Sequence, residues 1–177
     1  NEALKILTKK KNLILLQIKN LKINKLSEKS TSFGVLTQTK DLEKIDKNFI
    51  KLVSLKKANN KTLDDIIFAL KVVKHLNSNA IVLAKNMRTI GIGLGQTNRI
   101  DSLRLAIDNN KSNNLYKKFV CASDGFFPFT DAMKLLKKNG CKDIVQPFGS
   151  KNDGKIINYA VKHKLTLYYA KKRLFKH

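Results

Sequence analysis

Cysteine is scarce in this sequence, and long apolar runs are missing. The two cysteines of the 177 residues, Cys121 and Cys141, are too few for a disulfide framework or a four-ligand zinc site. We expect them to be small core residues in a protein of the reducing cytosol. No run of 18 apolar residues exists, and the first residues lack the basic and apolar regions of a signal peptide. The sequence therefore predicts neither a membrane span nor secretion.

Acidic residues and arginine are also scarce. The chain has 13 Asp and Glu against 36 Lys and Arg, a formal charge of +23, but only four of the basic residues are Arg. This charge fits a polyanionic partner such as nucleic acid, a phosphorylated ligand or an acidic membrane. Nucleic-acid readers rely mostly on the bidentate fork of Arg, however, and Lys is also a residue that AT-rich codons supply. We therefore interpret most of the charge as a solvated surface, and we expect neither nucleic acid nor a membrane as a partner.

The remaining composition is that of a folded protein. Apolar residues make up 42% and charged residues 28%, which is typical of a globular chain with one or two domains. The sequence begins at Asn and not at Met, which suggests a piece of a longer protein. The first 60 residues are irregular and rich in Lys, and two apolar runs, at 12–18 and 32–38, predict strands there.

From residue 62 onward the apolar pattern becomes regular. Thr62 followed by Asp65 resembles a capping box and predicts a helix that ends near Leu76. Strands are expected at 80–84, 89–92, 119–122, 143–146 and 166–170, and further helices at 98–108, 131–139 and 153–163, with Gly140 as a C-cap. Strands that alternate with helices of about ten residues indicate a three-layer α/β fold with parallel pairings.

Three segments can carry chemistry, and each has two interpretations. The glycine-rich bend 91–96 either cradles an anion with its backbone N–H groups or makes a tight turn that needs positive φ. The loop 123–131 holds three Phe, which either line a pocket for a flat ligand or fill the core below it. The C-terminal stretch 171–177 either binds phosphate through Arg173 or is a frayed, solvated tail. The signature of zinc deaminases is absent, which excludes metal-assisted deamination.

Five segments in a fixed order carry a family resemblance. They are 78–86, 89–102 (T-I-G-I-G-L-G-Q-T-N-R-I-D-S), 122–131 (A-S-D-G-F-F-P-F-T-D), 146–150 (Q-P-F-G-S) and 173–177 (R-L-F-K-H). Together they resemble the AICAR transformylase family, the folate-dependent domain of bifunctional purine biosynthesis proteins that also carry an IMP cyclohydrolase domain. Weaker matches at 9–13 and 34–38 extend the resemblance over the whole chain.

The resemblance implies a fold and a reaction. The fold would be cytidine-deaminase-like without zinc, a three-layer α/β arrangement with a mixed sheet flanked by helices. Residues 1–60 would end the first deaminase-like half of the transformylase domain, and residues 61–177 would form the second half. The chain would be the C-terminal part of AICAR transformylase, which transfers the formyl group of 10-formyltetrahydrofolate to the 5-amino group of AICAR (aminoimidazole carboxamide ribotide) on the way to IMP. No metal is implied, and the active sites would be shared across a homodimer.

The resemblance also assigns roles to individual residues. Those expected to contact AICAR are Asn79, Arg99, Phe126, Arg173 and Phe175. Asn79 would be catalytic, its amide N–H donating to the developing oxyanion, and Arg173 would bind the phosphate. Those expected to contact the folate are Ile100, Phe126, Asp131, Ser150 and Lys151, with Asp131 on the pterin ring and Phe126 between the two substrates.

The chain departs from the family pattern at several positions. Gly125 stands in place of Ala, Thr130 of Arg, Phe148 of Gly and Leu94 of Ala. The Phe148 change puts the turn geometry in question if that Gly needs positive φ. The family's catalytic Lys-His pair, which occurs in a segment like F-K-H-x-x-P, would lie upstream of Asn1, as would further AICAR-binding groups and the cyclohydrolase domain. We therefore expect an incomplete active site in the isolated chain.

The sequence leaves two other functions open. One is a basic nucleic-acid-binding module, which a steep salt dependence of RNA binding would indicate. The other is a non-catalytic subunit that completes its site with a separate N-terminal partner.

Overall fold

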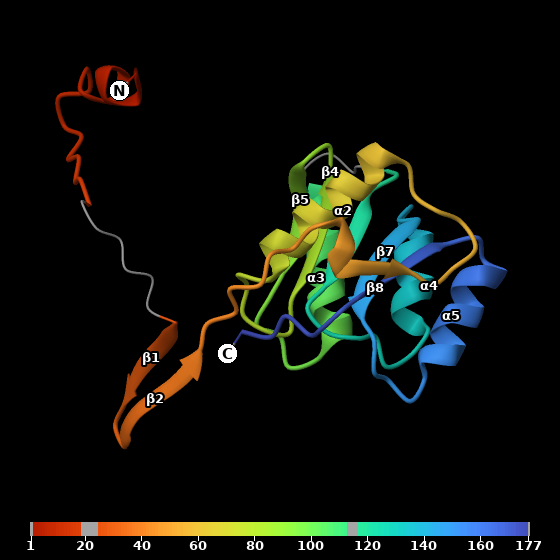
Figure 1. Cartoon of the computed structure of the whole chain (residues 1–177). Helices are drawn as coiled ribbons and strands as arrows, with labels where there is room; N and C mark the ends of the chain where they lie inside the picture. The colour runs from red at the N-terminus through yellow and green to blue at the C-terminus, as the bar shows by residue number, and fades with distance from the viewer. Residues whose placement is uncertain (1, 19–24, 113–116, 177) are drawn as a thin grey trace. The chain divides into compact units, whose positions relative to one another are not determined.

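The computed structural model describes residues 2–18, 25–112 and 117–176, and the chain divides into two compact units, 1–43 and 44–177 (Figure 1). This division falls before the expected boundary at 60/61, because Ile45 and Phe49 are buried in the core of the second unit. That the two parts belong to two halves of a deaminase-like domain stays a prediction.

The first unit has little regular structure. It contains the helix α1 (Glu2–Leu7) and an antiparallel hairpin of β1 (Leu26–Thr31) and β2 (Gly34–Thr39). The strand predicted at 32–38 is confirmed as β2. The strand predicted at 12–18 is wrong, because this segment pairs with no strand among the described residues and its apolar side chains are exposed.

The second unit is built on one mixed sheet. Its strands are β3 (Ile50–Leu52), β4 (Ile81–Lys85), β5 (Arg88–Gly93), β6 (Val120–Ser123), β7 (Asp143–Pro147) and β8 (Thr166–Ala170). They lie in the order β3-β8-β7-β6-β4-β5. The pairs β6–β7 and β7–β8 are parallel and the other pairs antiparallel. The predicted strands from residue 80 onward are therefore confirmed, and β3, which follows the short 3-10 helix η1 (Lys47–Phe49), was not predicted.

Helices cover both faces of this sheet, as Figure 1 shows. The helix α2 (Asn60–Val73) packs on one face, against side chains such as Val82 and Ala84 of β4. The other face carries α3 (Arg99–Ser112), α4 (Asp131–Lys138) and α5 (Asp153–Lys162), packed against the alternate side chains Ile81 and Leu83. Because side chains alternate along a strand, one run of apolar residues supplies both cores. The predicted three-layer α/β fold with a mixed sheet flanked by helices is confirmed.

The start of α2 differs from the prediction. Its N-cap is Asn59, whose side-chain oxygen accepts a hydrogen bond from the backbone N of Thr62 at 2.8 Å. The capping box expected from Thr62 and Asp65 is therefore wrong. The Asp65 carboxylate instead accepts from the backbone N atoms of Asn86 (3.0 Å) and Met87 (2.7 Å), which have φ of +52° and +56° in the turn between β4 and β5. A buried carboxylate thus binds the N–H groups of a left-handed turn.

The end of α4 agrees with the prediction. Gly140 has φ of +88°, and its backbone N donates to Lys137 O at 3.1 Å. The N of Cys141 donates to Leu136 O at 3.0 Å, which completes a Schellman motif. Cys121 and Cys141 are buried core residues as expected, and burial raises the pKa of both thiols. Within the described ranges, none of the helices has the length and apolarity that crossing a bilayer requires.

Candidate functional site

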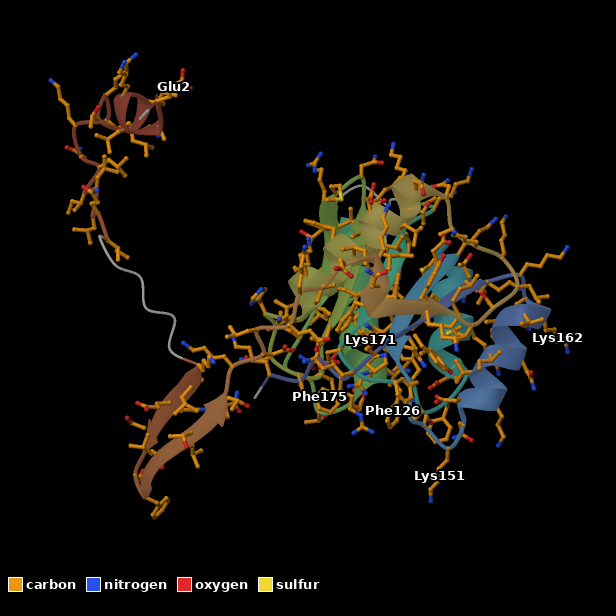
Figure 2. All side chains as sticks on the ribbon, viewed as in Figure 1. Glu2, Phe126, Lys151, Lys162, Lys171 and Phe175 are labelled. Atoms are coloured by element: carbon orange, nitrogen blue, oxygen red, sulfur yellow. The ribbon has the colours of Figure 1, made fainter. Side chains whose placement is uncertain are left out.

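Four predicted site residues come together at one end of the second unit. Arg99 begins α3, Phe126 lies in the loop after β6, and Arg173 and Phe175 follow β8. The Cζ atom of Arg173 lies 4.8 Å from the ring centroid of Phe126 and 5.7 Å from that of Phe175, and Figure 2 shows these two Phe on the same side of the unit. The Cζ of Arg99 lies 5.9 Å from the Phe175 ring. Two guanidinium groups and two rings therefore form a cluster at the carboxyl ends of β6 and β8, where open α/β sheets bind ligands.

The C-terminal segment is held in place by backbone hydrogen bonds. The N of Leu174 donates to Asp124 O at 2.9 Å, and Leu174 is buried. Ser78 N donates to Lys176 O at 2.9 Å, and Lys176 N donates to Ser78 Oγ at 3.3 Å. The interpretation as a frayed tail is therefore wrong for residues 171–176, while His177 lies outside the described residues.

Arg99 is held by a carboxylate that the sequence analysis did not assign. Its Nη2 lies 3.0 Å from Asp124 Oδ1, its Nε 3.4 Å from the same oxygen, and its Nη1 donates to the carbonyl of Phe126 at 3.2 Å. The side chain of Asp124 is fully buried and that of Arg99 is 12% exposed. Asp124 Oδ2 is buried and has no hydrogen-bond partner among the described residues. Arg99 thus fixes the loop that carries Phe126, and the S-D-G triplet was the signal that could have pointed to Asp124.

Gly125 makes this arrangement possible. A Cβ atom on Gly125 would lie 2.7 Å from Arg99 Cζ and 2.7 Å from Phe175 Cε1, far inside van der Waals contact. Gly125 stands where the family pattern has Ala, so the guanidinium and the ring occupy the space that a methyl group would need. The replacement of Ala by Gly at position 125 therefore leaves room for the side chains of Arg99 and Phe175.

The loop with three Phe combines both interpretations made from the sequence. Phe127 is fully buried and fills the core, with its backbone N donating to Gln146 Oε1 at 3.1 Å. Phe126 is half-buried against Arg173, and Phe129 is 64% exposed. One ring therefore anchors the loop while a neighbouring ring faces the cluster.

The glycine-rich bend serves mainly to let α3 approach β5. A Cβ on Gly93 would lie 2.7 Å from the carbonyl carbon of Ser102, and one on Gly91 would lie 3.0 Å from that of Ala106. Gly95 has φ of +66°, so the tight-turn interpretation is confirmed there. The Gly95 N donates to the carbonyl of Asn77 at 3.0 Å, so it does not point to an anion.

Asn79 is next to this bend, with its amide donors already engaged. Its Nδ2 donates to the carbonyls of Gln96 (2.9 Å) and Thr97 (3.2 Å). Because both contacts are to carbonyl oxygens, the nitrogen must face them and the oxygen Oδ1 must point the other way. The half-buried Asn79 therefore offers an acceptor, and not the donor that the resemblance assigns, to a molecule at the site.

The loop after β7 carries Ser150 and Lys151. Asp153 Oδ2 accepts from the backbone N of Gly149 (2.8 Å) and of Ser150 (3.2 Å), and Ser150 Oγ accepts from Asn152 N at 3.1 Å. Gly149 has φ of +108°, and a Cβ atom placed on it would lie 4.0 Å from Arg173 Nη2. The positive φ is therefore at Gly149, and Phe148 is absent from the residues with positive φ, so the turn tolerates Phe there.

The other expected folate residues are less closely grouped. Lys151 is exposed, and Figure 2 shows its side chain directed away from the fold. Asp131 is exposed at the first turn of α4, where its Oδ1 accepts from Ala132 N at 2.8 Å. Ile100 is half-buried and packs on the core beneath α3. The described residues contain no group of three His, Cys, Asp or Glu side chains placed to hold a metal ion.

The family model and the similar proteins point to the same family. The family model described as the AICARFT/IMPCHase bienzyme matches residues 1–109. The bifunctional purine biosynthesis protein PurH of Thermoanaerobacter sp. (strain X514) is 43% identical over 176 residues, which are 99% of this chain and 34% of that protein. The PurH protein of Buchnera aphidicola subsp. Baizongia pistaciae is 42% identical over 180 residues, 99% of this chain and 34% of its own length. The chain thus spans about a third of the length of these relatives.

One solved structure is also similar in part. It is a diaminohydroxyphosphoribosylaminopyrimidine deaminase/5-amino-6-(5-phosphoribosylamino)uracil reductase from Thermotoga maritima, with 20% identity and a TM-score of 0.34 over 55% of this chain and 33% of that one. This likeness is too slight to define the fold.

These matches correct the function expected from the sequence. The expected function was specifically that of the C-terminal part of AICAR transformylase, with a nucleic-acid module or a non-catalytic subunit as alternatives. The matching family model is that of the bienzyme, and the relatives are named for the bifunctional protein, so the assignment is to that protein in general and not to a C-terminal transformylase part. The chain belongs to the AICARFT/IMPCHase bienzyme family.

Proposed function

We propose that residues 44–177 supply a binding site for a phosphorylated aromatic nucleotide to a bifunctional enzyme of purine biosynthesis. The observation that carries the proposal is Arg173, which lies over the rings of Phe126 and Phe175 and makes no ion pair among the described residues. A planar guanidinium with open donors suits a phosphate, and aromatic rings suit a flat base. AICAR, an aminoimidazole ribotide, has both groups.

The neighbouring residues support this ligand with different roles. Arg99 is neutralised by Asp124, so it orients the Phe126 loop and leaves phosphate binding to Arg173. Asn79 presents Oδ1, which would accept a hydrogen bond from the amine of the aminoimidazole and hold its lone pair toward an acyl donor. In this proposal Asn79 positions the nucleophile, while proton removal depends on groups elsewhere in the enzyme.

For the class of enzyme, we propose a one-carbon transferase with 10-formyltetrahydrofolate as the co-substrate. Asp131 offers an exposed carboxylate to a pterin N–H, while Ser150 and Lys151 lie on the loop next to Arg173 and Ile100 at the start of α3. We propose no metal. The site in this chain alone is incomplete in this proposal, since the family's catalytic segment of the form F-K-H-x-x-P is not in its sequence and the chain spans about 34% of the length of its relatives.

Three further expectations stay proposals. The cytidine-deaminase-like assignment of the fold agrees with the order and pairing of the strands in the second unit. A homodimer that shares its sites is supported by the first unit, where large apolar side chains such as Ile14 (85%), Leu16 (88%) and Phe33 (100%) are exposed. We expect the protein to work in the cytosol.

Isothermal titration of the 177-residue chain with AICAR tests the binding site. Arg173→Lys keeps the charge but removes the planar fork, so we expect the affinity to fall about tenfold or more. Arg104→Lys is the matched control, because Arg104 is exposed and its one ion pair within the described part of the chain is with Asp101 on the same helix. Equal affinities of the two variants would refute the proposal.

The folate part is tested separately. Asp131→Asn should weaken binding of a 10-formyltetrahydrofolate analogue and leave AICAR binding unchanged, because Asp131 is not in the arginine cluster. Formyl transfer should be absent with the chain alone. Full turnover by the chain alone would contradict the incomplete site.

A further inference from the structure

Asp124 is a fully buried carboxylate that contacts three separate segments of the candidate site. Its Oδ1 accepts from Nη2 of Arg99 at 3.0 Å, where α3 begins. Its backbone N donates to the carbonyl of Ala80 at 3.1 Å, just before β4. Its own carbonyl accepts from the N of Leu174 at 2.9 Å, in the segment that carries Phe175. Asp124 is therefore bonded to the start of β4, to α3 and to the C-terminal segment at once.

The charge of Asp124 acts on the arginine cluster, which consists of Arg99, Phe126, Arg173 and Phe175. In this cluster two guanidinium groups share one ring, since the Cζ atoms of Arg99 and Arg173 lie 5.9 Å and 5.7 Å from the ring centroid of Phe175. Two like charges on one ring repel each other. The Asp124 carboxylate offsets the charge of Arg99, because the side chains of this pair are 0% and 12% exposed and are little screened by water.

The second guanidinium has no such partner. Among the ion pairs of the described residues, Asp124 pairs with Arg99 and none includes Arg173, which is exposed. The other carboxylate oxygen of Asp124 has no hydrogen-bond partner in the described part of the chain. The cluster therefore has a net charge of one, and this charge is on Arg173.

Arg99 keeps donors that its present contacts do not use. A guanidinium has five N–H groups, and the contacts of Arg99 with Asp124 and with the carbonyl of Phe126 use one on each of its three nitrogens. One N–H on Nη1 and one on Nη2 remain. Arg99 without a carboxylate beside it would thus be a second charged donor for an anionic ligand.

The net charge of the cluster sets how many phosphate groups it can bind. Each phosphate group that leaves water on binding loses hydration, and a nearby cation offsets this cost. One free guanidinium matches one phosphate through its planar fork. A second phosphate requires a second free cation, which the pairing of Arg99 with Asp124 removes.

We propose that Asp124 is a specificity-determining residue of this cluster, which neutralises Arg99 and so makes the site prefer a nucleoside monophosphate to the diphosphate of the same nucleoside. The proposal rests on the function proposed above, in which the cluster binds AICAR. Asp124 acts through Arg99 and does not itself contact the ligand.

Isothermal titration of the 177-residue chain with AICAR and with the 5′-diphosphate of the same nucleoside measures the preference as a ratio of two dissociation constants. We expect the wild type to bind AICAR about threefold to tenfold more tightly than the diphosphate, an effect of the size expected for one unit charge in a partly solvated site. Asp124→Asn keeps an oxygen that can accept from Arg99 but leaves two net charges in the cluster, so the ratio should shift toward the diphosphate by about fivefold or more. Arg99→Gln leaves a net charge of zero and should shift the ratio the other way.

The double variant Arg99→Gln/Asp124→Asn separates charge from structure. Its cluster has the same net charge as that of the wild type, so the ratio should return to the wild-type value although the contact between the two side chains is changed. A merely structural role of Asp124 would weaken the binding of both ligands and leave the ratio unchanged. The exposed lysines are the same in every variant, and raising the salt concentration should reduce the shifts.

Asp108→Asn is the matched control. It also removes one negative charge from α3, but Asp108 is exposed and pairs with Lys111 at 3.1 Å, so the ratio should stay at the wild-type value. Circular dichroism reports whether each variant folds. If Asp124→Asn alone does not fold, the ratios of Arg99→Gln and of the double variant decide.

Three results would overturn the proposal while AICAR binding stands. They are a wild type without preference for AICAR, the wild-type ratio in both single variants, and a double variant whose ratio differs from that of the wild type as much as a single variant does. Absence of saturable AICAR binding by the wild type would instead overturn the proposed function together with this role of Asp124.

Discussion

The buried pair of Arg99 and Asp124 makes a quantitative prediction about stability. In Arg99→Gln the Asp124 carboxylate loses its counter-ion in a place where it is fully buried. Breaking a buried pair by removing one partner costs about 3–5 kcal/mol, because the remaining charge is left without compensation. Asp124 Oδ2 already lacks a hydrogen bond, so no second group in the described part of the chain compensates for the loss. We therefore expect the upper half of that range.

The same helix provides a matched control. Arg104 pairs with Asp101 at 2.8 Å, but the two side chains are 63% and 41% exposed. Arg104→Gln should cost no more than about 0.5 kcal/mol, since exposed pairs contribute little. The double variant Arg99→Gln/Asp124→Asn removes both buried charges and should be more stable than Arg99→Gln alone by about 1 kcal/mol or more.

Urea unfolding at pH 7, followed by circular dichroism, measures all three variants. A difference below about 1 kcal/mol between Arg99→Gln and Arg104→Gln would refute the assignment of Asp124 as a buried ionised partner. So would a double variant that is less stable than Arg99→Gln.

Three smaller predictions concern backbone and pH. Gly93→Ala should destabilise the chain by about 1–3 kcal/mol, because its Cβ would lie 2.7 Å from the Ser102 carbonyl carbon, and thermal unfolding would show it. Gly154→Ala, with nothing within 4 Å of its Cβ at the start of α5, should instead stabilise by about 0.5–1 kcal/mol in the same assay, and a loss would contradict the open geometry. The pKa of the Tyr169 phenol is higher in the folded chain than in the unfolded chain, so the unfolded chain loses the phenol proton at lower pH. The contribution of Tyr169 to the free energy of unfolding is therefore complete below about pH 10 and declines above it. Unfolding at pH 9 and pH 11 should therefore show a smaller loss in Tyr169→Phe than in the wild type, and an equal loss would exclude the effect.

The sequence predicted the second unit well because its signals are local. The strands from β4 to β8 are apolar segments between turns. The helix α4 ends at Gly140, and Gly is the residue type that most readily adopts the positive φ found there. What could not be predicted depends on partners distant in the chain. β3 has only three residues and exists through its pairing with β8, and the exposed run at 12–18 has strand composition but no strand beside it among the described residues.

The candidate site shows the same limit. The Phe loop and Arg173 were evident from residue type, since aromatic rings in a loop and an Arg near a strand end are unusual. The role of Asp124 was not evident, because its partner is 25 residues away and only the folded chain brings them together.

Of the basic residues behind the net charge of +23, Arg and Lys differ in where they lie relative to the candidate site. Arg99 donates from three nitrogens to two acceptors, a carboxylate and a backbone carbonyl, and it lies over a ring. A Lys ammonium is a compact point charge that cannot reach both acceptors in one plane. In a chain with only four Arg, two occupy the aromatic cluster, where planarity matters, while the lysines described around it are mostly exposed. The location of the planar donors, and not the sum of the charges, is therefore the feature on which the proposed anion site rests.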